Sequence, residues 1–187
     1  DEKKMVVFPN CDVIDPYNRT IKKAVCRPFN YDDLVIKQEC YIGPGALFKR
    51  TALEKMGGWN ADLRMAPDRE FWMRVGLLGE ISIYPKTLAY YRMHTKSTSY
   101  FQSDFQVAEE YIKVMENYFG RNDVPERLQK QKKIAYGNAY LMSSRLHLRG
   151  GRVGYCLQRL RSALQMNTDI SLSKAFVMLT RTTISRI

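Results

Sequence analysis

The sequence predicts a mixed α/β region followed by an all-α region. Up to about residue 103, short apolar runs that suit strands alternate with short segments of helical periodicity. From residue 104 onward, apolar residues recur at helical spacing in one segment after another. Strands with helices, followed by helices alone, indicate two separate packing arrangements. We therefore expect an α/β domain over residues 1–103 and a basic helical tail over residues 104–187.

The first expected elements form a β-hairpin. Residues 5–13 (MVVFPNCDV) have the pattern of a strand. Pro9 within it fits an edge strand or a bulge, because proline has no N–H to donate to a ladder. The following DPYNRT is rich in turn residues, and IKKAVC provides a second strand. A strand, a turn and a strand in direct succession predict a hairpin.

Two short helices are expected next. In NYDDLVIKQ, Asn30 precedes apolar residues at helical spacing and so predicts a capped helix. The apolar run CYIGPGALFKR follows and is broken by its Gly-Pro-Gly sequence. Thr51 is then the expected cap of a second helix, which stops at Gly57 and Gly58.

A third helix and a long β segment complete the expected α/β region. The segment PDREFWMRVGLLG predicts a helix over about residues 68–79 that ends at Gly79. ISIYPKTLAYYRMH then alternates well enough for one or two strands, interrupted at Pro85 and Lys86.

The tail combines helical periodicity with positive charge. Helices are expected over residues 104–119, 125–149, 153–166 and 170–185. Between Arg121 and Arg161, only Asp123 and Glu126 oppose a set of basic residues: Arg127, Lys130, Lys132, Lys133, Arg145, Arg149, Arg152 and Arg159. The net charge of the 187 residues is +11. Such a surface suits nucleic acid, anionic lipid headgroups or phosphorylated small molecules, and it equally suits a solvated helix face.

Composition indicates the cellular setting. No run of about 18 apolar residues occurs, and the charged start DEKKMVVFPN lacks an adequate apolar segment for a signal peptide. The four cysteines, at positions 11, 26, 40 and 156, form no CxxC pair and have no matching histidine cluster. They predict buried free thiols in a reducing compartment, rather than a zinc site or a disulfide framework. We therefore expect a cytoplasmic protein.

Asp68 is the candidate for chemistry on the third expected helix. By helical spacing it shares a face with Phe71 and Trp72, whereas Glu70 and Arg74 lie elsewhere, spaced as an i,i+4 ion pair. An aspartate at a helix start is commonly a cap. A carboxylate that the helix dipole keeps ionised beside apolar surface is also suited to accept a proton from a hydroxyl. On spacing alone, both readings stand.

Other residues give weaker signals. His94 follows a strand-like stretch and has Arg92, Lys96 and several hydroxyls close by in sequence. It suits a metal or a phosphate-bearing ligand as well as an ordinary packed or surface position. His147 lies in a long helical segment without such neighbours, and we expect a structural role. GPGALFKR has neither the Walker nor the dinucleotide-binding spacing, so its glycines are expected to allow a sharp turn or a close approach to a ligand.

Taken together, about residues 40–100 resemble the second half of a family 2 glycosyltransferase with the GT-A fold. Four motifs occur in the order usual for that family. They are a small-residue strand ending in an aromatic and a basic pair (ALFKR, 46–50), a GGW turn (57–59), an acidic residue opening a helix with a tryptophan and an arginine (DREFWMR, 68–74), and a YRxH pattern (91–94). The resemblance implies an incomplete GT-A-like mixed sheet with helices, followed by the all-α region.

The resemblance also implies roles for individual residues. Asp68 would be the general base of an inverting transfer from a nucleotide sugar to a saccharide or lipid-linked acceptor. His94 would ligate a divalent metal, Mg²⁺ or Mn²⁺, or contact the diphosphate. The residues expected at the substrates are Gly45, Ala46, Trp59, Trp72 and Arg92. For Trp72, a core position is equally open.

The chain also departs from the family pattern. The nucleotide-binding half that ends in a DXD motif is not found in these 187 residues, and Pro67 stands where a second carboxylate usually precedes the base. We therefore expect the acceptor-side half of a transferase, cytoplasmic and held near anionic membrane by its basic helices. The alternative is a non-catalytic basic helical module that binds nucleic acid or anionic membrane. The sequence contains no nucleic-acid recognition motif, which disfavours that ligand.

Overall fold

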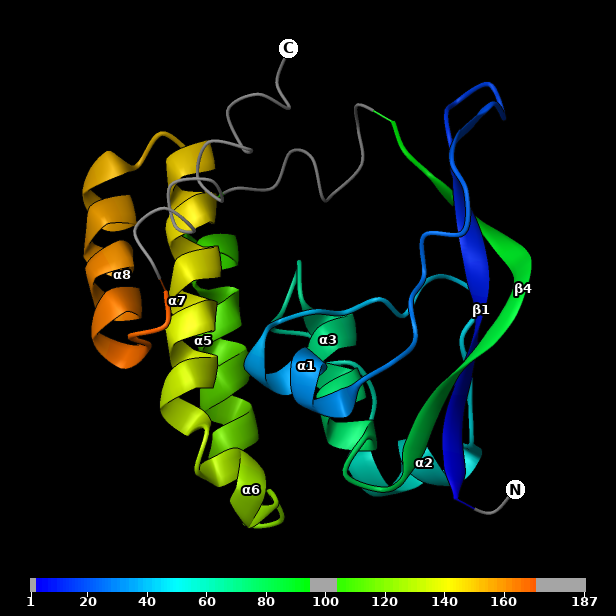
Figure 1. Ribbon diagram of the computed structural model, residues 1–187, viewed down its shortest axis with the longest axis horizontal. Helices are drawn as coiled ribbons and strands as arrows, with labels where there is room; N and C mark the ends of the chain where they lie inside the picture. Colours follow the sequence, from blue (N-terminus) through cyan, green and yellow to red (C-terminus); the bar gives the residue numbers. More distant parts are fainter. Residues whose placement is uncertain (1–2, 95–103, 171–187) are drawn as a thin grey trace. The chain divides into compact units, whose positions relative to one another are not determined.

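The computed structural model describes residues 3–94 and 104–170, and the chain divides into two compact units. The first, which we call the sheet unit, consists of residues 1–34, 39–60 and 68–101. The second, the helical unit, consists of residues 35–38, 61–67 and 102–187. The described residues form four strands and seven helices, so the predicted mixed α/β class is confirmed (Figure 1).

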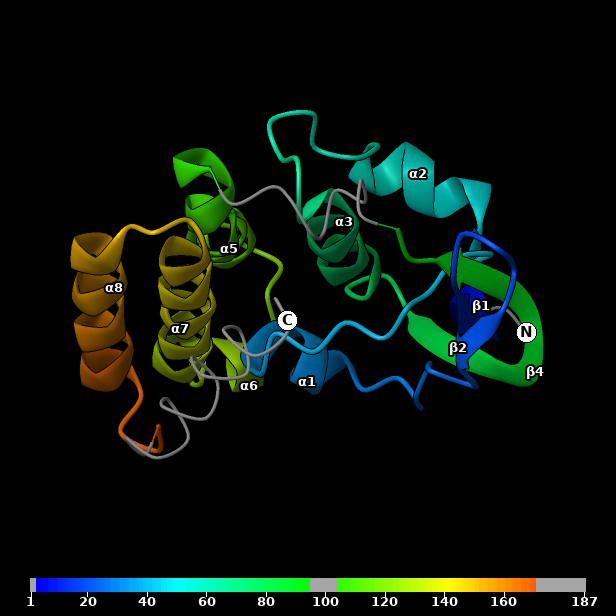
Figure 2. The same ribbon diagram turned by 90° about the horizontal axis from the view of Figure 1, so that it is seen from above.

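The sheet is built around β1 (Lys4–Ile14). β4 (Glu80–Arg92) runs parallel to β1 along its whole length, and the two strands lie side by side in Figures 1 and 2. On its other side, β1 pairs antiparallel with β3 (Leu47–Phe48) near its start and with β2 (Thr20–Lys22) near its end. The sheet is therefore mixed, and β1 is its central strand.

Pro9 lies inside this central strand, at a place where its missing N–H breaks no ladder. β3 pairs with residues 6–7 of β1, and β2 pairs with residues 13–14. Pro9 falls between these two ladders, so the prediction of an edge position is wrong, whereas the alternative of a bulge agrees with the irregular register beside it.

That irregularity is a bulge in β4. The pairing with β1 passes from Tyr84, opposite Pro9, directly to Thr87, opposite the next residue of β1. Pro85 and Lys86 are the extra residues. The interruption predicted at these two positions is thus a local bulge within one continuous strand of 13 residues.

The predicted hairpin and the first predicted helix are confirmed. Asp15 closes the turn between β1 and β2, because its Oδ1 accepts the backbone N–H groups of Tyr17 and Arg19 at 2.8 and 2.9 Å. Helix α1 (Tyr31–Ile36) follows. Asn30 caps it as predicted, since its Oδ1 accepts the N–H of Asp33 at 3.1 Å.

Helix α2 (Arg50–Met56) begins one residue before the expected cap. Lys49 is the N-cap, with no capping hydrogen bond from its side chain, so the prediction of Thr51 as the cap is wrong. The predicted stop is correct. Gly57 ends the helix with a φ of 74°, and its N–H donates to the carbonyl of Leu53 at 2.8 Å.

Helix α3 (Pro67–Val75) is shorter than the predicted 68–79, because the chain turns after Val75 and enters β4 at Glu80. Pro67 occupies the first helical position, where the missing N–H costs no helical hydrogen bond. All of residues 70–75 are buried. Glu70 and Arg74, which the spacing put away from the aromatic face, are therefore buried as well.

The helical unit contains α5 (Phe105–Phe119), α6 (Glu126–Gln129), α7 (Lys132–Arg149) and α8 (Val153–Met166). α7 lies between α5 and α8 in both views (Figures 1 and 2). The predicted helix 125–149 is two helices that meet near Lys130, and the predicted helix 170–185 lies almost wholly outside the described residues. None of the helices in the described part of the chain has the length and apolar character needed to cross a membrane.

Candidate functional site

A pocket of about 390 Å³ in the sheet unit gathers most of the predicted site residues. We call it the aromatic pocket. Its lining consists of Ile42, Gly43, Pro44, Gly45, Ala46, Phe48, Trp59, Asp68, Trp72 and Tyr91. Five residues expected at the site from sequence motifs are in this set: Gly45, Ala46, Trp59, Asp68 and Trp72. The sequence reasoning had assigned no role to Phe48 or Tyr91, although both belong to the motifs that carry the family resemblance.

Four aromatic rings form a cluster at this pocket. The centroids of Phe48, Trp59, Phe71 and Trp72 lie between 4.3 and 6.4 Å apart, and most pairs meet edge to face. Trp59 is 48% exposed, whereas Trp72 is only 4% exposed. Trp59 is thus the ring available to stack against a ligand, and Trp72 is mainly a core residue at the pocket wall.

A buried ion pair fixes the turn that carries Trp59. The guanidinium of Arg74 donates to both carboxylate oxygens of Glu70, each at 2.7 Å. It also donates to the carbonyl of Gly58 at 2.8 Å and to the carbonyl of Met56. Arg74 on α3 therefore holds the GGW turn through its backbone immediately before Trp59. The i,i+4 spacing of Glu70 and Arg74 predicted the pair but not its burial.

The opposite part of the lining is made largely of backbone. Gly45 has a φ of 84°, which favours glycine, and a Cβ there would lie 3.1 Å from Cγ of Pro9 and 3.4 Å from Cβ of Ala89. The expectation that these glycines permit a sharp turn is therefore confirmed at Gly45. Because Gly45 and Ala46 present little side chain, a ligand can approach the main chain closely at this wall.

Asp68 is the carboxylate in the aromatic pocket. It is exposed, and it is the second residue of α3, so it is not the N-cap of this helix. Its Oδ1 accepts the N–H of Arg69 at 2.7 Å, a contact to the next residue rather than the bond to the second or third helical N–H that defines a cap. The cap reading is therefore wrong, and the reading as a base stays a prediction.

Arg92 and His94 are not among the residues that line the aromatic pocket. The guanidinium of Arg92 donates to the carbonyl of Asp15 at 2.9 Å and to Oδ1 of Asn18 at 2.8 Å, and so braces the β1–β2 turn. His94 is exposed just beyond β4. Over residues 3–94 and 104–170, no group of three or more His, Cys, Asp or Glu side chains is placed to hold a metal ion.

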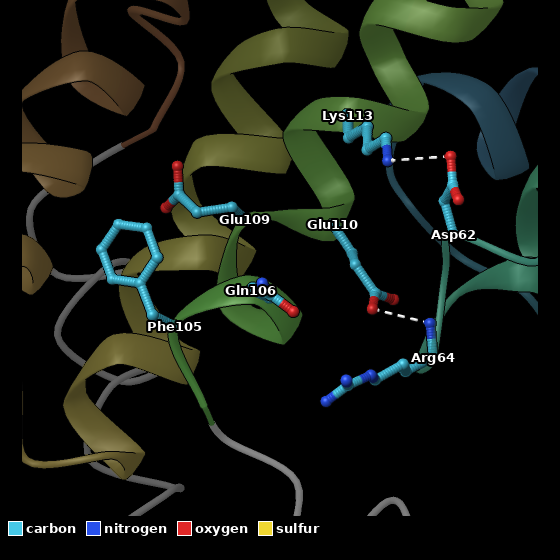
Figure 3. Close-up of a pocket in the computed structure, with 7 residues that line it drawn as sticks. All are labelled: Asp62, Arg64, Phe105, Gln106, Glu109, Glu110 and Lys113. Carbon is cyan, nitrogen blue, oxygen red and sulfur yellow. Dashed lines mark hydrogen bonds and ion pairs between the residues drawn. The ribbon is translucent and has the colours of Figure 1, made fainter.

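A larger pocket, of about 510 Å³, lies in the helical unit (Figure 3). It is lined by Asp62, Arg64, Phe105, Gln106, Glu109, Glu110 and Lys113. Glu110 accepts the backbone N–H groups of Arg64, Met65 and Ala66 at 2.7, 2.7 and 3.0 Å, and Lys113 lies 3.5 Å from Asp62. These charges already compensate one another, so the larger pocket is less suited to chemistry than the aromatic pocket.

Glu109 belongs to a hydrogen-bonded network in the helical unit. It accepts from Ser143 at 3.0 Å, from Nε2 of His147 at 2.7 Å and from Arg159 at 2.9 Å. Burial acts to raise the pKa of Glu109, but these hydrogen bonds outweigh it and lower that pKa below its ordinary value of 4.5. Arg152 donates to Nδ1 of His147 at 2.8 Å. His147 is fully buried, which confirms its predicted structural role.

The basic residues of the tail do not all form one solvated face. Arg152 and Arg159 are used in the network around Glu109 and His147. Arg145 is partly buried, and burial together with the neighbouring Arg149 lowers its pKa. Arg161 on α8 is exposed, and four further exposed basic residues gather at the junction of α6 and α7: Arg127, Lys130, Lys132 and Lys133.

No protein-family model, curated protein or solved structure matches this chain. The family resemblance therefore rests on the four sequence motifs alone.

Proposed function

We propose that the aromatic pocket is the acceptor-binding side of an inverting, GT-A-like glycosyltransferase of family 2, with Asp68 as its general base. One observation supports this most strongly. Five residues selected from motifs, namely Gly45, Ala46, Trp59, Asp68 and Trp72, come from separate segments of the chain and line one pocket. An exposed carboxylate beside a half-exposed indole ring suits a sugar hydroxyl better than it suits an apolar ligand.

The chain's own residues account for the acceptor half of the reaction. The acceptor sugar stacks on Trp59, and one of its hydroxyls lies at Asp68. As that oxygen forms a bond to the anomeric carbon of the nucleotide sugar, its proton moves to the Asp68 carboxylate. The bond from the anomeric carbon to the diphosphate oxygen breaks, and the nucleoside diphosphate leaves. A single displacement of this kind inverts the configuration at that carbon.

The expected divalent metal, Mg²⁺ or Mn²⁺, would offset negative charge on the leaving diphosphate. His94 is a single nitrogen ligand outside the pocket lining, and the described residues around it do not form a metal-binding group. These residues do not fit a complete metal site, so we derive no step of the reaction through the metal.

The exposed basic residues at the α6–α7 junction support a second element of the proposal, peripheral binding to a cytoplasmic anionic membrane that carries a lipid-linked acceptor. Residues 127–133 contain four exposed basic side chains, and Lys130 pairs with Glu126 at 2.8 Å. A juxtaposed cluster of this kind is attracted by anionic lipid headgroups. Co-sedimentation with phosphatidylserine vesicles, weakening as salt rises, is expected; binding of duplex DNA but not of vesicles would favour the alternative nucleic-acid module.

Intrinsic fluorescence offers a direct test of saccharide binding. The chain has two tryptophans, Trp59 and Trp72, and both line the aromatic pocket. A saccharide that stacks there should change the emission, and Trp59→Phe should remove most of the change, since Trp59 is the exposed ring. Emission that stays constant with every oligosaccharide of a broad panel, up to millimolar concentration, would contradict the acceptor site.

Because the nucleotide-binding half is not found in these 187 residues, transfer is tested after a DXD-bearing donor half has been joined ahead of residue 1. The assay contains a panel of UDP-, GDP- and dTDP-hexoses, Mn²⁺ and the saccharides that bind. Asp68→Asn should abolish labelled product without reducing saccharide binding. Asp62→Asn is the matched control, because Asp62 is an exposed aspartate that lines the other pocket. Equal loss in both variants, or no loss in Asp68→Asn, would overturn the assignment of the base.

A further inference from the structure

Two cysteines of the sheet unit lie in direct contact. Cys11 is on β1 and Cys26 follows β2, and their Sγ atoms are 3.5 Å apart. They are 2% and 8% exposed. The sulfur atoms are brought together by the surrounding backbone, which places the segment after β2 against β1.

Three hydrogen bonds fix this placement. The N–H of Val25 donates to the carbonyl of Cys11 at 2.9 Å. The N–H of Cys26 donates to Oδ1 of Asn10 at 3.0 Å, and the N–H of Ala24 donates to Oδ1 of Asp12 at 2.8 Å. Each bond joins residues 10–12 of β1 to residues 24–26 after β2, so the two thiols stay in contact without a covalent link.

The sulfur pair lies directly behind the wall of the aromatic pocket. A Cβ added to Gly43 would be 3.0 Å from both Sγ atoms, so only glycine fits there without displacing a sulfur atom. Gly43 is also part of the pocket lining. A change in the distance between the two sulfur atoms is therefore expected to displace Gly43 in this wall.

Burial keeps Cys11 as a thiol at neutral pH. Burial, and then the hydrogen bond and charge of Cys26, raise the pKa of Cys11 from 9.0 to about 12. The other two cysteines are placed differently. Cys156 is in the helical unit, where its Sγ lies 3.3 Å from Oγ of Ser144, and Cys40 is only partly buried.

We propose that Cys11 and Cys26 form a redox-active dithiol, which a peroxide oxidises to a disulfide that ties the segment after β2 to β1 behind the aromatic pocket. The sulfur of one thiol attacks hydrogen peroxide and gives up its proton, the O–O bond breaks, and a sulfenic acid forms with release of water. The sulfur of the second thiol then displaces a second water to form the S–S bond. In total two S–H bonds break, one S–S bond forms, and the peroxide takes up two electrons and two protons. The sulfur atoms need to approach by about 1.5 Å. The two thiols can form this bond whether or not the aromatic pocket takes part in sugar transfer.

The sequence makes the pairing easy to read by mass spectrometry. Trypsin leaves the four cysteines in four different peptides, residues 5–19, 24–37, 38–49 and 153–159, because Pro28 protects the bond after Arg27. The folded full chain is treated with hydrogen peroxide until half of its thiols are lost, blocked with iodoacetamide, and digested without reductant.

The expected product is one linked species, peptide 5–19 joined to peptide 24–37, that dithiothreitol separates. Cys40→Ser and Cys156→Ser should retain it, and Cys26→Ser should remove it. The oxidised wild-type chain should melt up to roughly 10 °C higher, because the bond closes a loop in the unfolded chain. The proposal is overturned if peroxide leaves all four thiols intact, links Cys26 to Cys40 instead, or consumes thiols only as sulfinic and sulfonic acids.

Discussion

The buried pair of Glu70 and Arg74 gives the sharpest test of how α3 is held. The two side chains are 8% and 11% exposed, and the guanidinium of Arg74 donates hydrogen bonds to Glu70 and to the carbonyls of Met56 and Gly58. Glu70→Gln keeps the shape and one acceptor but leaves the guanidinium charge uncompensated. Breaking a buried pair from one side costs about 3–5 kcal/mol. Because one acceptor remains, we expect about 3 kcal/mol.

The matched control is Glu126→Gln. Glu126 and Lys130 have the same i,i+4 spacing and a similar separation of 2.8 Å, but their side chains are 82% and 72% exposed. An exposed helical pair contributes only about 0.3–0.5 kcal/mol. The two variants share the chemical change and differ in burial. Glu70→Gln is therefore expected to lower the free energy of unfolding several-fold more than Glu126→Gln does.

Urea denaturation measures both costs, with tryptophan emission reporting on the sheet unit and circular dichroism on the helices. A double-mutant cycle with Arg74→Met and Glu70→Leu adds a second check. The double variant removes both charges, so it should cost less than Arg74→Met alone, which strands a buried carboxylate. If Glu70→Gln costs no more free energy of unfolding than Glu126→Gln, the buried pair does not stabilise the GGW turn.

Three further outcomes follow from individual contacts. Asp68→Asn should change the free energy of unfolding by less than about 0.5 kcal/mol, because Asp68 is exposed. In the chain joined to a DXD-bearing donor half, the same substitution should lower labelled-sugar transfer at least about 100-fold, and retained transfer would exclude the base role. Gly43→Ala should cost about 1–3 kcal/mol in urea denaturation by crowding the two sulfur atoms. Gly154→Ala should stabilise α8 by up to about 1 kcal/mol, because a Cβ added there would meet no atom within 4 Å apart from its chain neighbours and the backbone of its own helix. Burial raises the pKa of Glu109, but hydrogen bonds to its carboxylate lower it more, so the folded pKa lies below 4.5. The stability that ionised Glu109 contributes is therefore complete above pH 4.5 and is lost as the pH falls through its folded pKa. Glu109→Gln should flatten the dependence of melting temperature on pH in this acid range. An unchanged slope would contradict the network.

Local signals in the sequence predicted those parts of the fold that depend on neighbours along the chain. Asn30 and Gly57 begin and end their helices through bonds that span three or four residues. The turn at Asp15 and the bulge at Pro85 are equally local, because each follows from side-chain hydrogen bonding or from a missing N–H. Such features are visible without knowing the partner of any strand.

What the sequence did not show depends on residues far apart along it. The parallel pairing of β1 with β4 joins segments about 76 residues apart, and nothing within either strand specifies the other. The carboxylate of Glu110 holds residues 64–66, which lie more than 40 positions earlier. The burial of Glu70 likewise depends on Arg74 reaching carbonyls of the GGW turn, so the periodic pattern alone placed this pair incorrectly.

Helix α3 explains why residues chosen from separate motifs line one pocket. Within nine residues, this helix brings Trp72 into the aromatic cluster, reaches the turn before Trp59 through Arg74, and presents Asp68 to the pocket. Since residues 70–75 are buried on every side, the helix axis is fixed, and the Asp68 carboxylate two residues ahead is carried by a rigid element rather than a loop. A general base needs that constraint, because proton transfer requires the acceptor hydroxyl and the carboxylate within hydrogen-bond distance as the new bond forms.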